Sequence, residues 1–524
     1  MPNSDCECRC TIKTTTPPTV SEAVAEYNLP DYLPDIARLM RTSVRFTQSG
    51  QYINGTTLEY DGRLDYSIIY ATSDGRIKST SFSSEAHGKI DGVNADGDCE
   101  IVPDISVQSL TCRLQNPRRL SARTRLSATA DVICDGELCP DVGKTDAATA
   151  DRIQKKCETA EYVCDVRVAD DSVPVSEDIE LDASMPRIGE IIFVELTPFL
   201  YETRYSSGKI GYKGDIVAQI LYSAQTETPD EVQKYYALTR KIPIYGEVDA
   251  ALPSENGFSY GCARINSFEY RSQVDSFGEN SIIEIDLSYT ATLHAMSNEK
   301  VCVISDMFSV DFESVNEFET VNLASVTRAG SFNFSSDATV PADDGAFPIV
   351  VTAYGDADIT GVEKVGSRLV LTGQSNVSVI TTDGQGSYMP RTYTVPIRAE
   401  TEAGKTADSF AYVGCASVLD VTVRYDGDGV RINEEIGVSY GVANIYGVRY
   451  VCRCNVRRDA PTQAVPSADM ILDYSPAGTK IWDVAKKYSV SPDDIAAANG
   501  VTSDTTDGRV LMIPHEKKPK ISLN

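Results

Sequence analysis

Hydrophobic and polar residues alternate with a period of two along most of the chain between residues 45 and 455. Residues 58–70 and 282–289 combine this alternation with β-branched and aromatic side chains, a pattern typical of strands with one buried face. Clusters of Gly, Asp, Asn and Ser, such as Asp74-Gly75 and Asp383-Gly384, separate these runs. The pattern predicts an all-β body.

Three stretches of this body are similar to one another. Each has a Gly turn, a short apolar strand and a second Gly, over residues 50–62, 208–216 and 366–375. Two cysteine positions recur later in each unit, first as Cys112, Cys262 and Cys415, and then as Cys164, Cys302 and Cys452. The recurrence predicts three related β-modules of roughly 140 residues, a usual domain size. They span residues 25–165, 166–312 and 313–455, after a flexible N-terminal tail over 1–24.

The pattern changes after residue 455. Residues 456–468 are polar and punctuated by proline, which predicts a linker. A strand over 470–474 is followed by a helix over 480–488, which has apolar residues on one face. Ser491 and Pro492 begin a second helix, and Asn499-Gly500 end it. A strand over 510–513 completes a small β-α-α-β domain, assigned to 469–516, before a C-terminal tail over 517–524.

Composition narrows the function classes. The 524 residues carry a formal net charge of −28, so phosphate backbones and anionic membrane surfaces are disfavoured as partners. Hydrophobic residues make up 42% and charged residues 24%, as in soluble globular proteins. The sequence contains neither an apolar run long enough to span a membrane nor an export signal. We therefore expect a cytoplasmic protein.

The cysteines suggest structural roles. Without an export signal, most of the 14 cysteines are expected to be reduced, and the repeated ones are expected to fill one packing position three times. Cys6, Cys8 and Cys10 form a C-x-C-x-C run that could bind a soft metal, but no second ligand pair with zinc-ribbon spacing accompanies it. We expect no bound metal, and the role of these three cysteines stays open.

Catalytic motifs are missing from the sequence. His87, His294 and His515 are the only histidines, and no zinc-protease or nucleophile-elbow motif accompanies them. Residues 399–406 have a Gly-Lys-Thr order but lie between strand-like segments, where a phosphate loop would need a strand and a helix. We expect a non-enzymatic protein without a cofactor. A carboxylate-based glycosidase in the β-body is the enzymatic alternative, and it would need two acids in one cleft.

The C-terminal segment resembles a LysM domain. Residues 481–488, together with Tyr474, Gly478, Asn499 and Pro514, occupy positions of the family pattern. The resemblance implies a groove that binds N-acetylglucosamine glycans between two loops. The groove residues are Gly478, Thr479, Lys480, Ile481, Asn499, Gly500, Val501 and Thr502. The core residues are Trp482, Tyr488 and Ile513. The family's usual entry, G-D-[ST]-L-W, is replaced by Gly-Thr-Lys-Ile-Trp, which favours a protein ligand over a glycan.

The body resembles the SPOCS repeats of the SipL family of clostridial spore-coat proteins. Residues 29–36, residues 116–121 and the Gly-strand-Gly repeats carry this resemblance. It implies a non-enzymatic scaffold in the mother-cell cytosol at the forespore surface, with the LysM domain binding the coat morphogenetic ATPase or another coat protein. The alternative is a cell-wall protein that binds peptidoglycan or a chitin-type glycan.

Overall fold

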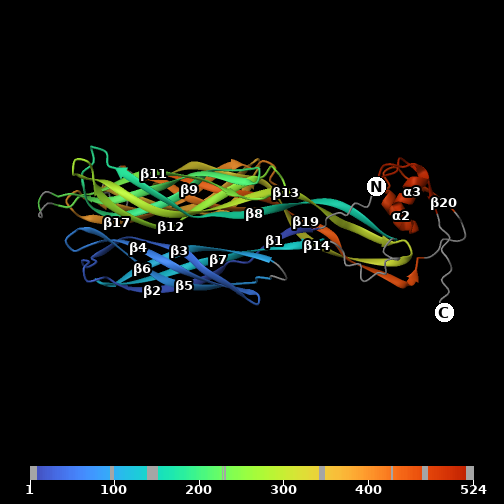
Figure 1. Ribbon diagram of the computed structural model, residues 1–524, viewed down its shortest axis with the longest axis horizontal. Coiled ribbons are helices and arrows are strands. Elements are labelled where there is room, and N and C mark those ends of the chain that lie inside the picture. Colours follow the sequence, from blue (N-terminus) through green and yellow to red (C-terminus); the bar gives the residue numbers. More distant parts are fainter. Residues whose placement is uncertain are drawn as a thin grey trace.

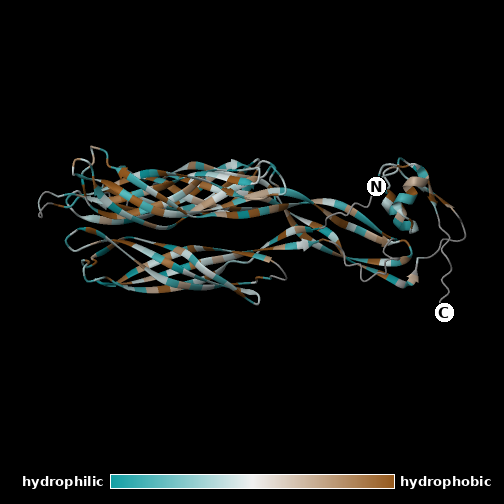
Figure 2. Cartoon of the chain, in the orientation of Figure 1, coloured by the Kyte–Doolittle hydropathy of each residue, from teal (hydrophilic) through white to brown (hydrophobic). Residues whose placement is uncertain are grey.

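The computed structural model describes residues 9–94, 99–138, 152–226, 228, 232–341, 348–426, 429–462 and 470–514. Antiparallel strands account for most of these residues, and the two helices among them lie near the C-terminus. The expectation of a mainly β protein is confirmed. Apolar and polar residues alternate along the strands, as Figure 2 shows.

Three sheets contain the longest strands and share one strand order. In each sheet the central strand is the last strand of its part of the chain (β7, β13 or β19). It pairs on one side with the first strand of that part and on the other side with the second-to-last strand. The first sheet contains β2 (Thr19–Asn28), β7 (Arg119–Glu137) and β6 (Cys99–Asn116), with β1 (Arg9–Thr15) also paired to β7. The second contains β8 (Ile153–Glu180), β13 (Asn280–Ser309) and β12 (Phe258–Val274). The third contains β14 (Phe312–Val340), β19 (Gly429–Pro461) and β18 (Phe410–Asp426).

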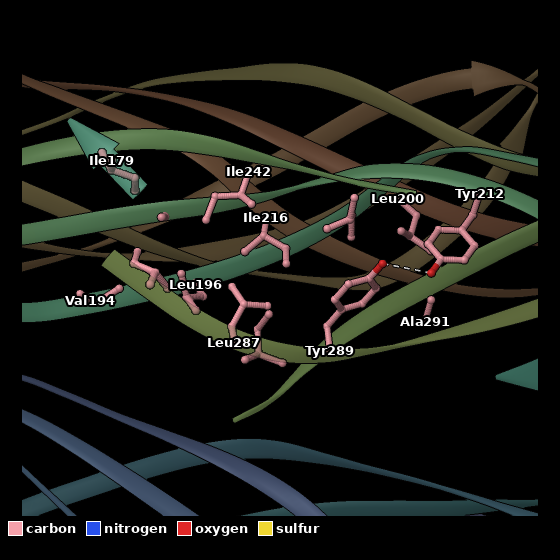
Figure 3. Packing of buried hydrophobic residues seen from close by; sticks show 14 of the residues in the cluster. Ile179, Val194, Leu196, Leu200, Tyr212, Ile216, Ile242, Leu287, Tyr289 and Ala291 are labelled. Carbon is pink, nitrogen blue, oxygen red and sulfur yellow. Dashed lines mark hydrogen bonds between the residues drawn. The ribbon is translucent and has the colours of Figure 1, made fainter. Parts of the chain in front are cut away.

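Each of these sheets faces a three-stranded meander. The meanders are β3 (Arg38–Asn54), β4 (Thr57–Ala71) and β5 (Ile77–Asp91); β9 (Ile188–Ser206), β10 (Lys209–Ala224) and β11 (Tyr235–Asp249); and β15 (Ile349–Val365), β16 (Arg368–Thr382) and β17 (Tyr388–Glu402). The apolar faces of a meander and its partner sheet form one core. Figure 3 shows the second of these cores, where the Tyr212 and Tyr289 hydroxyls are 3.0 Å apart.

The second Gly of each repeated stretch has a packing role. Gly62, Gly214 and Gly373 lie on the middle strand of each meander, opposite a β-bulge in the first strand. A Cβ atom at Gly214 would lie 2.3 Å from the Phe199 carbonyl oxygen, and one at Gly373 would lie 2.0 Å from the Asp358 carbonyl oxygen. Because the bulge brings the two backbones this close, these positions exclude any side chain.

The three meanders meet at one end of the molecule. One buried cluster takes residues from the same register positions of all three: Ile69, Leu221 and Ile380 from the middle strands, and Ile77, Tyr235 and Tyr388 from the third strands. The rings of Tyr235 and Tyr388 are 5.2 Å apart, and the Tyr235 hydroxyl accepts a hydrogen bond from the Ile77 amide at 2.6 Å. Equivalent residues from three segments therefore converge on one hub.

A buried ion pair lies beside this hub. Arg41 of β3 donates a hydrogen bond to Glu195 of β9 at 2.7 Å, and its side chain is 4% exposed. Its guanidinium also lies over the ring of Tyr354 from β15, 4.1 Å from the centroid. The three contributing strands belong to three different meanders, so this contact ties all three together.

Two ribbons extend beyond the paired sheets. Residues 153–164 of β8 pair with 297–309 of β13, and residues 312–324 of β14 pair with 445–461 of β19, without a third strand. Ile304, Met307, Val451 and Cys454 form a buried cluster between the ribbons. Figure 1 shows the elongated molecule, with the ribbons leading to the C-terminal helices at one end.

The structure corrects the expected domain boundaries. Residues 9–15 and 19–28 are strands paired to β7, so a flexible tail over 1–24 is wrong for the described residues 9–24. The boundary expected at 165/166 falls inside the continuous strand β8. The linker expected over 456–468 is also too long, because β19 continues to Pro461. These polar segments become strands because long partner strands satisfy their backbone groups.

The expectation of reduced cysteines is corrected at four of the described positions. Cys99 pairs with Cys134 across β6 and β7, and Cys262 of β12 pairs with Cys415 of β18. In the strand register, Cys262 pairs with Thr292 and Cys415 with Ser439, both deep in the partner strand, whereas Cys112 pairs with Ala122 near the start of β7. The expectation that Cys112, Cys262 and Cys415 fill one packing position three times is therefore wrong for Cys112. The Cys262–Cys415 disulfide forms because two repeated strands approach each other, which a comparison of sequence units does not reveal.

Candidate functional site

The C-terminal segment consists of β20 (Met470–Ser475), α2 (Ile481–Tyr488), α3 (Pro492–Asn499) and β21 (Arg509–Pro514). Helix α2 buries Ile481, Val484 and Ala485 and ends at Ser489 in the left-handed conformation. Pro492 begins α3, and Gly500 ends it with a φ of 60°. Proline at the start and glycine after the end suit the unpaired backbone groups and the left-handed cap of a helix. We call residues 470–514 the C-terminal unit.

The first predicted groove loop is bonded to a loop further along the chain. The Gly478 amide donates to the Thr506 carbonyl at 2.8 Å, and the Thr506 amide donates to the Thr479 carbonyl at 2.9 Å. Lys480 forms an isolated bridge with Thr505. The backbone of residues 478–480 is therefore engaged with residues 505–506, while the Lys480 side chain remains exposed.

Three of the predicted groove residues have structural contacts. Ile481 is 5% exposed in the unit's core, and Val501 packs against that core. The Asn499 side chain donates to the Ile495 and Met512 carbonyls and accepts from the Met512 amide, each at 2.7 Å. These bonds join α3 to β21. Thr502 and Gly500 are exposed in the second loop and remain accessible to a ligand.

Helix α2 packs against the end of the ribbons. Phe308 and Val310 share one buried cluster with Ile481, Val484 and the other core residues of the C-terminal unit. The Trp482 ring meets the Phe308 ring edge-on, with centroids 5.1 Å apart. Tyr488 and Ile513 belong to the same cluster, and the Tyr488 hydroxyl donates to Asp473 at 2.9 Å. Trp482 therefore joins the unit to the ribbon as well as contributing to the unit's own packing.

Asp306 of β13 is the polar centre of this contact. It accepts a hydrogen bond from the Trp482 indole Nε1 at 2.8 Å and forms an ion pair with the Lys486 ammonium at 2.7 Å. Burial opposes ionisation of the carboxyl, but the bonds from Lys486 and Trp482 outweigh it and lower the Asp306 pKa below its usual value. The contact thus combines an apolar cluster with a charge-assisted bond.

A second charge interaction lies near the first predicted loop. The Glu158 carboxylate of β8 has a lowered pKa, first because of its hydrogen bond from Lys156 and also because of the positive charge of Lys480. Lys480 therefore lies within electrostatic range of the ribbon. Lys480, a residue of the predicted groove, is thus close to β8 as well as exposed to solvent.

Acidification is expected to weaken this contact. Because the Asp306 pKa is lower in the docked state, its carboxylate stabilises docking above its usual pKa of 3.8, and this stabilisation is lost as the pH falls through the lowered pKa. Trp482 emission should shift to longer wavelength in a titration from about pH 6 to about pH 2. The Asp306→Asn variant should lack this step. An identical titration curve for the variant would contradict the assignment.

Two kinds of feature were not found in the part of the chain that the structure describes. The described residues contain no group of three or more His, Cys, Asp or Glu side chains that could hold a metal ion. Cys10 is buried in β1, where burial and then the charge of Asp135 raise the pKa of its thiol. Cys6 and Cys8 lie outside the described residues. None of the described helices has the length and hydropathy of a membrane span.

Sequence reasoning missed the ribbon half of this site. Asp306 and Phe308 lie at the end of a strand of 30 residues, more than 170 positions before their partners on α2. The alternation of that strand predicts which residues are buried, but not against which surface. No local signal could have identified this contact.

The comparisons with known proteins found no matches. No protein-family model matches the chain, and neither the curated proteins nor the solved structures contain a match.

Proposed function

We propose that the chain is a non-enzymatic scaffold of the SipL type, composed of three copies of one SPOCS-like β-module and a C-terminal LysM domain. The repeated strand order of the three sheet pairs supports the threefold division, with units beginning at β1, β8 and β14. The order of β20, α2, α3 and β21 is compatible with the LysM resemblance. The resemblance itself comes from the sequence motifs.

The single observation that carries the scaffold proposal is the shared hub of the three meanders. Equivalent residues of all three segments are buried together, which favours one packed body over a flexible string of modules. A rigid rod with a small unit docked at one end suits a protein that holds partners at fixed positions. The proposed partner of the C-terminal unit is the coat morphogenetic ATPase or another coat protein, and the proposed location is the mother-cell cytosol at the forespore surface.

The proposed partner surface is what remains exposed of the predicted groove. Gly478, Lys480, Gly500 and Thr502 are exposed, whereas Asn499 is engaged with β21. A glycan groove relies on a few convergent polar groups. Because Asn499 is occupied and the backbone of residues 478–480 is bonded to residues 505–506, a protein contact over the exposed loops is favoured.

The test is a binding assay with the full-length chain and the Thr502→Arg variant. We expect this variant to lose at least tenfold in affinity for the purified coat ATPase, because a large cation would obstruct the exposed loop. The control is Ala497→Arg, which adds the same side chain at an exposed position of α3. Equal binding by all three chains would contradict the proposal.

The alternative function is peptidoglycan binding, motivated by the LysM resemblance. Co-sedimentation with purified peptidoglycan distinguishes the two. If the full-length chain pellets with glycan and Thr502→Arg does not, the groove binds sugar and the glycan-binding alternative replaces the protein scaffold. If glycan leaves the chain in solution while the ATPase captures it, the scaffold proposal holds.

A further inference from the structure

The outer face of the second meander has a hollow. A pocket of about 680 Å³ lies over β9, β10 and β11. Gly211 lines it at the middle strand, between Arg204 of β9 and Glu247 of β11 in the strand register. Because Gly211 has no side chain, the sheet face is open at this point.

Folding does not require a glycine at this position. Gly211 does not have a positive φ, and no atom lies within 4 Å of the position its Cβ would occupy. This contrasts with Gly214 on the same strand, whose Cβ would collide with the Phe199 carbonyl oxygen. A glycine inside a strand weakens it, and such glycines often lie at bulges, at tight bends or where a ligand or another backbone approaches closely. The strand pairing is regular at Gly211, which favours close approach by another molecule.

The other two meanders provide an internal comparison. Counting from the glycines opposite the bulges, Gly211 corresponds to Glu59 in the first meander and Val370 in the third. In the same register, Arg204 corresponds to Tyr52 in the first meander and to Glu363 in the third. Tyr245 corresponds to His87 in the first meander and to Arg398 in the third. In the first meander the Tyr52 hydroxyl donates to Glu59, so polar side chains cover the equivalent surface. The middle strand of the second meander therefore lacks a side chain where the other two meanders carry one.

The walls of the hollow combine aromatic and cationic groups. Tyr201 and Tyr245 are 45% and 77% exposed on opposite strands of the meander. Lys209 pairs with Glu247 at 2.6 Å and Lys213 pairs with Glu202 at 3.3 Å, so these charges are balanced. Arg204, by contrast, forms no ion pair with the part of the chain that the structure describes. A guanidinium without an ion-pair partner can bind a single carboxylate at contact distance, whereas the net charge of −28 disfavours strongly anionic partners.

We propose that this hollow binds a segment of a partner protein that inserts an Asp or Glu side chain over Gly211, where Arg204 pairs with the carboxylate. Arginine binds carboxylates through two parallel hydrogen bonds, and the flanking tyrosines contact the apolar parts of the segment. Tyrosine and arginine are the residue types that dominate the centres of protein interfaces. This surface is independent of the C-terminal unit and of its proposed partner.

The experiment selects peptides from a phage-displayed library of random twelve-residue sequences on the full-length chain. The test variant is Gly211→Val, which fills the hollow with a residue that favours strands, and Arg204→Gln removes the charge. Glu59→Val, at the equivalent position of the first meander, is the control. Thermal unfolding of each variant checks that the fold is retained.

We expect selected peptides to share an Asp or Glu and to bind Gly211→Val and Arg204→Gln at least tenfold more weakly than the unaltered chain and Glu59→Val. Peptides that bind Gly211→Val equally, or that lack a shared acidic residue, would overturn the proposal. So would a library without any peptide that distinguishes the variants. Displacement of the peptides by N-acetylmuramic acid, but not by N-acetylglucosamine, would identify a sugar acid as the occupant and would overturn the protein assignment.

Discussion

The Phe308→Ala variant is expected to release the C-terminal unit from the ribbons while the β-body stays folded. Phe308 is 3% exposed and contacts both the Trp482 ring and the apolar residues of α2. Removing a buried phenylalanine ring costs about 3–5 kcal/mol, and most of that cost should appear as lost docking. Trp482 is the only tryptophan, so its emission should shift to longer wavelength. Small-angle scattering should show a broader distribution of shapes.

The matched control is Val315→Ala on β14. Val315 is 57% exposed on the neighbouring ribbon, so its truncation should change neither signal. A variant in which tryptophan emission stays unchanged while the whole chain loses stability would show that Phe308 belongs to the core of the β-body. That result would contradict the description of the contact as a separable dock.

The Glu195→Gln variant is expected to destabilise the whole β-body. It removes the carboxylate that pairs with the buried Arg41 guanidinium and leaves only the Coulomb attraction of Asp356, and breaking a buried pair in this way costs about 3–5 kcal/mol. Because Arg41 also lies over Tyr354, the loss should affect strands of all three meanders together. Chemical denaturation should show one transition, moved to lower denaturant concentration.

Two further variants test whether the loss of stability comes from the burial of this ion pair. Glu26→Gln breaks the exposed ion pair with Arg119, where solvent screens the charges and almost no loss of stability is expected. The triple variant Arg41→Met, Glu195→Gln and Asp356→Asn removes all three charges and should recover part of the lost stability. If Glu195→Gln costs no more than Glu26→Gln, the ion pair is not a coupling element of the hub.

The two predictions concern the two contacts that hold the molecule together, namely the hub of the β-body and the dock of the C-terminal unit. The hub joins the three meanders through one buried cluster, whereas the dock joins the C-terminal unit through another apolar cluster and one carboxylate. The body therefore supplies a rigid frame, and the C-terminal unit is the part that can separate from it. The hollow around Gly211 lies on the frame, so it can act without the dock.

The sequence by itself determined the strand content and the repeated glycines. Period-two alternation identified the strands, because each strand buries one face against its partner sheet. The repeated stretches contain Gly62, Gly214 and Gly373, and the bulges opposite them allow no Cβ. Periodicity and capping residues also placed the two C-terminal helices close to their observed bounds. Each of these features depends on neighbours in sequence or on one adjacent strand.

Only the tertiary structure decided which buried faces meet. The Cys262–Cys415 disulfide, the Arg41–Glu195 pair and the Asp306–Trp482 bond each join residues more than 150 positions apart. Alternation shows that a residue is buried, but any apolar face can cover another, and a charge can be buried only where its partner arrives from elsewhere. For the same reason Asn499, placed in a ligand groove by its motif, is engaged with the Met512 backbone instead. Contacts between distant segments depend on how whole sheets pack, and this is the information that local patterns lack.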